Sequence, residues 1–123
     1  MIYFIGAGPG AADLITVKGK ELLEKADLII YAGSLVNPEL LNYAKPECII
    51  MDSAKMTLEE VIAAMVPAAQ AGKLVVRLHT GDPSVYGAHR EQIDLLRSYN
   101  LDFEIVPGVS SFCAAAACLD AEY

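Results

Sequence analysis

The chain is short of basic residues and of long apolar runs, and each shortage argues against a class of partner. Nine lysines and arginines stand against 16 aspartates and glutamates in 123 residues, so the formal net charge is −7. A chain with this charge repels phosphate backbones, which argues against nucleic acid as a partner. No apolar stretch approaches the roughly 20 residues that span a bilayer, so no membrane partner is expected.

The sequence also lacks the signals of secretion, disulfide pairing and metal binding. Its N-terminus, MIYFIGAGPG, has no basic region ahead of a long apolar stretch, which predicts no signal peptide and a cytoplasmic protein. The cysteines Cys48, Cys113 and Cys118 form no C-x-x-C pair, and we expect buried free thiols in a reducing compartment. The cysteines, His79 and His89 show no ligand spacing, so no metal site is expected.

Apolar strand patterns alternate with helix patterns along the chain, of which 54% is hydrophobic. This alternation predicts one α/β domain over residues 1–123, with a mostly parallel five-stranded sheet and helices on both faces. Strands are predicted at Ile2–Ile5, Leu28–Tyr31, Glu47–Met51, Leu74–Leu78 and Asp102–Val106. Helices are predicted after the caps Thr16 and Asn37, from Thr57 to Gln70 with Gly72 closing it, from Arg90 to Ser98, and from Ser110 onward. Pro67 is expected to kink the third helix or to end its regular part.

Three loops with unusual chemistry follow predicted strands: Gly6–Asp13, His79–His89 and Pro107–Ser111. Parallel sheets bind ligands outside the carboxyl ends of their strands. We therefore expect these loops to converge on one edge of the sheet.

The first loop, Gly6–Ala11, fits the G-x-G-x-x-G/A pattern of dinucleotide-binding proteins. That fingerprint needs the loop to run straight into a helix, and an acidic residue to end the second strand. Here the first helix cap is Thr16, and the second strand ends in Tyr31-Ala32-Gly33 with Asp27 ahead of it. The sequence thus argues against a nicotinamide dinucleotide. Two interpretations stay open: a backbone wall for a bulky ligand, or a turn that only tucks the strand against its helix.

The loop His79–His89 combines glycine with a restrained carboxylate. Gly81 permits backbone geometries that other residues resist, and Asp82 is held extended by the proline that follows it. A carboxylate fixed at a strand end accepts hydrogen bonds or complements a cation, although an Asx turn would use the same residue structurally. His79 and His89 can titrate near neutral pH, but histidines beside loops more often hydrogen-bond or face solvent.

Four blocks, GAGPG…DLIT, YAGSLVNPELL, RLHTGDPSVYGA and VPGVSSF, together resemble the tetrapyrrole methylase family in content and order. The second and third blocks have the form of the branch that methylates precorrin-4 or cobalt-precorrin-4 at carbon 11. Other branches act on uroporphyrinogen III, other precorrins, the diphthamide precursor or ribosomal RNA. The acidic charge and the YAGSLV block argue against the last two.

The resemblance implies a Rossmann-like, nucleotide-binding N-terminal domain, a second α/β domain beyond this chain, and S-adenosyl-L-methionine in the cleft between them. It further implies a tetrapyrrole substrate, S-adenosyl-L-homocysteine as product, a homodimer, and no turnover by this chain alone. The resemblance does not identify a catalytic residue. Asp82 and Tyr86 are the candidates for that role. The cofactor contacts that it implies are Pro9, Thr80, Gly81, Asp82, Val85, Tyr86, Ser110 and Ser111.

Other functions remain open on the sequence. Within the family, the substrate could be uroporphyrinogen III or precorrin-2. A nicotinamide-dependent oxidoreductase domain is weakened by the missing acidic residue. A nucleotide-binding or dimerisation module without activity is the non-enzymatic alternative.

Overall fold

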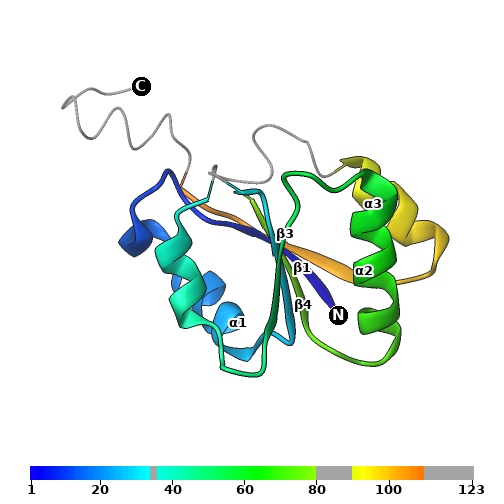
Figure 1. Cartoon of the computed structure of the whole chain (residues 1–123), viewed down its shortest axis with the longest axis horizontal. Helices are drawn as coiled ribbons and strands as arrows, with labels where there is room; N and C mark the ends of the chain where they lie inside the picture. The colour runs from blue at the N-terminus through cyan, green and yellow to red at the C-terminus, as the bar shows by residue number, and fades with distance from the viewer. Residues whose placement is uncertain (34–35, 80–89, 110–123) are drawn as a thin grey trace.

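The computed structural model describes residues 1–33, 36–79 and 90–109 of the chain (Figure 1). In these residues, strands and helices alternate as predicted. The strands are β1 (Ile2–Gly6), β2 (Leu28–Tyr31), β3 (Ile49–Asp52), β4 (Val75–His79) and β5 (Phe103–Val106). The α-helices are α1 (Val17–Lys25), α2 (Leu58–Gln70) and α3 (Arg90–Ser98), joined by the 3-10 helices η1 (Ala12–Leu14) and η3 (Pro38–Tyr43).

The strands form one five-stranded sheet in the order β3-β2-β4-β1-β5, and every pairing is parallel. This confirms the predicted α/β class and parallel sheet. Strand β4 lies between β1 and β2, and its register places Arg77 beside Phe4 on one side and Ile30 on the other. Because all strands run in the same direction, the loops that follow them begin at one edge, here called the carboxyl edge.

The helices cover both faces of the sheet, as predicted (Figure 1). Successive side chains of a strand point to opposite faces, which divides the core into two layers. The layer with Phe4 and Ile30 packs against α2 and α3, and the layer with Ile5 and Ile29 packs against α1 and η3. Full burial of one such side chain stabilises the fold by about 1.5–3 kcal/mol.

Two α-helices begin at the predicted threonine caps. The Thr16 hydroxyl accepts a hydrogen bond from the backbone N–H of Gly19 at 3.1 Å. At the start of α2, the Thr57 hydroxyl accepts from the Glu60 N–H at 3.1 Å, while the Glu60 carboxylate accepts from the Thr57 N–H at 3.3 Å. The predicted capping box is confirmed, because both hydrogen bonds of that motif are present.

The segment after Asn37 differs from the prediction in detail. The Asn37 side chain caps it as expected, but η3 is a 3-10 helix, in which the Leu40 N–H donates to the Asn37 carbonyl at 3.1 Å. Pro46 follows closely. A proline disfavours the α conformation in the residue before it, here Lys45, so the segment cannot continue as a longer helix. The next strand was predicted to start at Glu47 but starts at Ile49, because Cys48 closes a turn by donating to the Lys45 carbonyl at 3.0 Å.

Pro67 does not end α2, which continues to Gln70, so that alternative of the prediction is wrong. Proline removes the hydrogen bond to the preceding turn, but the residues after it still hydrogen-bond as a helix end. Gly72 closes the helix as predicted, with φ of +79° and its N–H donating to the Ala69 carbonyl. None of the described helices is long and apolar enough to cross a membrane. The helix predicted from Ser110 onward, with Cys113 and Cys118, lies outside the described residues.

Candidate functional site

The three loops predicted to converge all leave strands at the carboxyl edge. The first, Gly6–Asp13, is described in full between β1 and α1. The second is described only at His79, which ends β4, and the third only at 107–109, after β5. Since β4 and β5 both pair with β1, these starting points flank the first loop.

The first loop is fixed at one end and open in its middle. Its Ala7 N–H donates to the carbonyl of His79, so the loop is tied to the end of β4. Gly8 has φ of +83°, and a Cβ there would lie 2.9 Å from the Leu14 carbonyl oxygen. Gly10 also has a positive φ, +127°, but no atom of the described residues lies within 4 Å of where its Cβ would be. The loop therefore presents bare, accessible backbone at Gly10, which is the wall-like arrangement that a bulky ligand can approach.

The loop does not lead straight into an α-helix. The 3-10 turn η1 lies between it and α1, and α1 starts only after the Thr16 cap. Pro9, a predicted cofactor contact, is half-buried between Gly8 and the exposed Gly10. The geometry thus departs from a pyrophosphate site, in which the helix N-terminus follows the glycine loop directly.

Asn37 joins the first loop to the segment after β2. Its side-chain N–H donates to the Gly10 carbonyl at 2.7 Å, while its side-chain oxygen accepts from the Glu39 N–H at 2.9 Å. One amide side chain therefore caps η3 and holds the glycine loop. The sequence predicted only the cap, since nothing local to Asn37 indicates a hydrogen-bond partner 27 residues away.

The turns after β2 and β3 also meet at this edge. Gly33 has φ of +56°, and a Cβ there would lie 2.8 Å from the Ala54 Cβ and 3.0 Å from an Asp52 side-chain oxygen. Asp52 ends β3 and accepts a hydrogen bond from the Ala54 N–H at 2.8 Å. No local sequence pattern indicates Asp52, because its position beside Gly33 depends on the pairing of β2 with β3.

A buried polar group lies on the α2/α3 face of the sheet. Arg77 is 7% exposed in β4; its Nη1 donates to the Ile30 carbonyl at 3.2 Å and its Nε to the Gln92 side-chain oxygen at 3.3 Å. Burial lowers the pKa of the Arg77 guanidinium below its ordinary value. His79 lies on the same face two positions along β4, and its ring stacks on Phe4 with centroids 5.9 Å apart.

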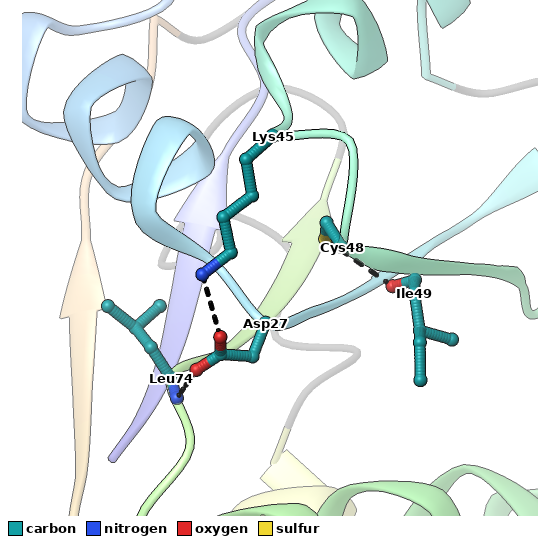
Figure 2. A network of polar contacts seen from close by, with 5 residues as sticks. All are labelled: Asp27, Lys45, Cys48, Ile49 and Leu74. Carbon is teal, nitrogen blue, oxygen red and sulfur yellow. Dashed lines mark hydrogen bonds and ion pairs between the residues drawn. The ribbon is translucent and has the colours of Figure 1, made fainter.

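A second polar cluster lies at the opposite, amino edge (Figure 2). Asp27 accepts hydrogen bonds from Lys45 Nζ and from the Leu74 N–H, each at 2.8 Å. The Lys45 bond, and then the Leu74 bond, hold the pKa of Asp27 below its ordinary value. Asp27 is thus engaged in the structure and lies at the wrong edge to serve as the acidic residue of a dinucleotide site.

Cys48 lies in the same cluster and corrects one expectation. Its free thiol is only partly buried, where a buried thiol was expected, and it donates to the Ile49 carbonyl at 3.5 Å. Burial is still the main reason that the pKa of Cys48 is raised above its ordinary value. Among the residues that the structure describes, no group of three or more histidines, cysteines, aspartates and glutamates is placed to hold a metal.

Most of the predicted contacts fall outside the described residues, and only Pro9 lies within them. The others are Thr80, Gly81, Asp82, Val85, Tyr86, Ser110 and Ser111. His89 lies outside as well.

Comparison with known proteins identifies the family of the chain. The family profile of the Tetrapyrrole (Corrin/Porphyrin) Methylases matches residues 1–123. The chain belongs to this family. A curated methylase of similar sequence is the cobalt-precorrin-4 C(11)-methyltransferase of Methanocaldococcus jannaschii, 60% identical over 121 residues, which are 98% of this chain and 47% of that protein.

Solved structures of other tetrapyrrole methylases share the fold. The X-ray structure of a cobalt-precorrin-4 methyltransferase superimposes with a TM-score of 0.95 at 52% identity, covering 98% of this chain and 51% of that one. A Thermus thermophilus uroporphyrin-III C-methyltransferase, complexed with S-adenosylhomocysteine, superimposes with a TM-score of 0.77 at 34% identity, over 94% of this chain and 47% of that one. The chain spans about half the length of each of these three methylases.

Proposed function

We propose that this chain is the cofactor-binding N-terminal domain of an S-adenosylmethionine-dependent methyltransferase of cobalamin biosynthesis. Its substrate would be precorrin-4 or cobalt-precorrin-4, methylated at carbon 11. The observation that carries the proposal is the 60% identity to a cobalt-precorrin-4 C(11)-methyltransferase over nearly the whole chain. A second α/β domain, matching the remaining length of such relatives, would form the other wall of the cleft. The proposal includes a homodimer, as the family resemblance implies, and the cytoplasmic location expected from the sequence.

The first loop fits a role in holding the cofactor. Bare backbone at Gly10 admits a bulky ligand, and the hydrogen bonds from Asn37 and from Ala7 keep the loop in place. S-adenosylmethionine brings both the methyl group and its own leaving group. The protein therefore contributes mainly orientation, and a loop fixed from two sides suits that task.

The remaining cofactor contacts are proposed from the family resemblance. They are Pro9 in the first loop, Thr80, Gly81, Asp82, Val85 and Tyr86 after β4, and Ser110 and Ser111 after β5. No catalytic acid or base is assigned. A carboxylate near the sulfonium aids binding, but it favours the ground state if its attraction is too strong, because the positive charge is lost in the transition state.

Calorimetry tests the cofactor. We expect the two-domain protein to bind S-adenosylhomocysteine and to give no heat with NAD. Heat with NAD alone would favour an oxidoreductase domain, while silence with both ligands would favour a dimerisation module. The 123-residue chain, measured in parallel, is expected to show no methyl transfer.

Transfer of a labelled methyl group tests the substrate. We expect the two-domain protein to label precorrin-4 or cobalt-precorrin-4, and the ratio of kcat/KM between them identifies the physiological substrate. Labelling of uroporphyrinogen III or precorrin-2 instead would place the protein in another branch of the family, such as that of the Thermus thermophilus enzyme.

Asp82 is proposed to position the cofactor or the substrate without acting as a base. Asp82→Ala in the two-domain protein should therefore weaken binding of S-adenosylhomocysteine or of the tetrapyrrole by about tenfold, the loss of one charge-assisted hydrogen bond. Asp82→Asn, which keeps the shape and one acceptor oxygen, is the matched control and should lose less. Normal affinity combined with abolished turnover in Asp82→Ala would overturn this role.

A further inference from the structure

The guanidinium of Arg77 is buried in the centre of the sheet, where the described residues give it no charged partner. Among the described residues, its hydrogen-bond partners are two neutral groups, the Ile30 carbonyl and the Gln92 side chain. Gln92 is itself only 7% exposed. A charge transferred from water into a protein interior is costly unless it is paired, and neutral partners offset that cost only in part. Replacing a buried charge together with its polar partner by apolar side chains of similar size is often neutral or stabilising, so stability alone does not account for the arginine.

The positions of the two hydrogen-bond partners of Arg77 show which elements the guanidinium connects. Ile30 lies near the end of β2, just before the turn at Gly33 with its positive φ. Gln92 lies in the first turn of α3, and this helix starts after the loop that leaves the carboxyl end of β4. One planar group on β4 therefore holds a neighbouring strand and a helix at the positions where both reach the carboxyl edge.

Arg77 also bears on the glycine loop through its own strand. His79 lies two residues along β4 from Arg77, and its carbonyl accepts a hydrogen bond from the Ala7 N–H. The stacking of His79 on Phe4 ties the same strand end to β1. A shift of β4 relative to β2 or α3 would therefore move the anchor of the first loop.

We propose that Arg77 is a positioning residue: through Ile30 and Gln92 it fixes β2, β4 and α3 relative to one another at the carboxyl edge, and so sets the position of the first loop through its Ala7 anchor. The expected effect on binding of S-adenosylhomocysteine rests on the proposed function. The structural part of the inference, the placement of the Ala7 anchor, does not depend on any ligand.

The decisive variant removes the charge and its partner together. Arg77→Met with Gln92→Leu replaces both by apolar side chains of similar size, and such replacements of buried polar groups are often neutral or stabilising. We expect the thermal midpoint to be kept or raised, while the dissociation constant for S-adenosylhomocysteine in the two-domain protein rises about tenfold or more, because small misplacements are costly at such sites. Unchanged affinity in this stable double variant would overturn the proposal.

Single variants separate orientation from charge and from stability. Gln92→Glu keeps the acceptor for Arg77 and should bind S-adenosylhomocysteine within about twofold of wild type. Arg77→Lys keeps the charge but lacks the planar fork and should bind weakly; full affinity in this variant would overturn a role for the fork. Val66→Ala lies near the end of α2 away from the carboxyl edge, and it should lower the thermal midpoint without changing affinity.

A measurement without ligand keeps this inference distinct from the proposed function. Amide hydrogen exchange of Ala7 reports the hydrogen bond to His79, and we expect about tenfold faster exchange in the double variant but not in Val66→Ala when both are corrected for global stability. Faster exchange at Ala7 with no S-adenosylhomocysteine binding by wild type would refute the proposed function and retain the positioning role. Unchanged exchange at Ala7 would refute the positioning role.

Discussion

Gly8 is the residue of the first loop where a side chain has least room. A Cβ there would lie 2.9 Å from the Leu14 carbonyl oxygen, while a Cβ at Gly72, with a similar positive φ of +79°, would have no atom of the described residues within 4 Å. Alanine at either position must adopt a left-handed conformation, which costs about 1–2 kcal/mol. Only alanine at Gly8 also meets backbone that cannot rotate away.

We therefore expect Gly8→Ala to lower the free energy of unfolding by at least about 1 kcal/mol more than Gly72→Ala, the range in which overpacking begins. Urea denaturation of the two variants measures the difference. Equal losses would show that the backbone around Leu14 moves aside without cost.

The Asp27 carboxylate makes the stability of the fold depend on pH (Figure 2). Its pKa is lowered in the folded chain, mainly by the bond from Lys45 and next by that from Leu74. The unfolded state then binds the proton more tightly, so the ionised carboxylate stabilises the fold above about pH 4, and this contribution is lost as the pH falls through the lower, folded pKa.

We expect Asp27→Asn to lower the urea midpoint at pH 7 and to differ less and less from wild type as the pH falls below about 4. Replacing Lys45 by Met should reproduce part of the loss at pH 7, since it removes the hydrogen bond that lowers the pKa of Asp27 most. A difference between wild type and Asp27→Asn that stays constant down to acid pH would contradict this assignment.

At the scale of elements, α2 depends on its capping box. Loss of a threonine cap destabilises a helix by about 1 kcal/mol, because the first N–H groups lose their acceptor. Thr57→Ala should show that loss in thermal or urea denaturation, whereas Thr57→Ser keeps the hydroxyl and should lose only a few tenths. Equal stability of the alanine and serine variants would mean that water replaces the cap without cost.

The same local chemistry explains which elements could be predicted. The starts of α1 and α2 were predicted correctly because a cap and its partner lie within one turn of chain, as Thr57 and Glu60 do. The start of β3 and the 3-10 character of η3 were not, because both depend on how the chain turns around Pro46. Pro67 marked a lost hydrogen bond but not the end of α2, since the end of the helix is set by Gly72.

At the scale of the whole molecule, the sequence predicts which edge of the sheet the three loops leave better than it predicts the hydrogen bonds that hold that edge. Alternating strands and helices imply a parallel sheet, and a parallel sheet places the loops at one edge. The bonds that fix this edge join residues far apart in sequence: Asn37 reaches Gly10 across 27 positions and Arg77 reaches Gln92 across 15. Their partners depend on the packed fold and leave no local pattern.

The strand order also predicts how stability is distributed. Strands β1 and β4 are paired on both sides, whereas β3 is an edge strand with Ile49 54% exposed. Opening β3 breaks one ladder and exposes little new apolar surface, while opening β4 breaks two ladders and exposes both core layers. We therefore expect amide protons of Val76 and Leu78 to exchange only through global unfolding, and those of β3 to exchange through smaller openings.

Hydrogen exchange read by NMR at increasing urea measures this directly. The β4 amides should show the full urea dependence of global unfolding, and the β3 amides a weaker dependence and a smaller protection free energy. Thr57→Ala serves as an internal control, because it should lower the protection of β4 by the loss of global stability while changing local openings of β3 less. Equal protection of β3 and β4 would mean that the edge strand opens only with the whole sheet, in contradiction to its exposure.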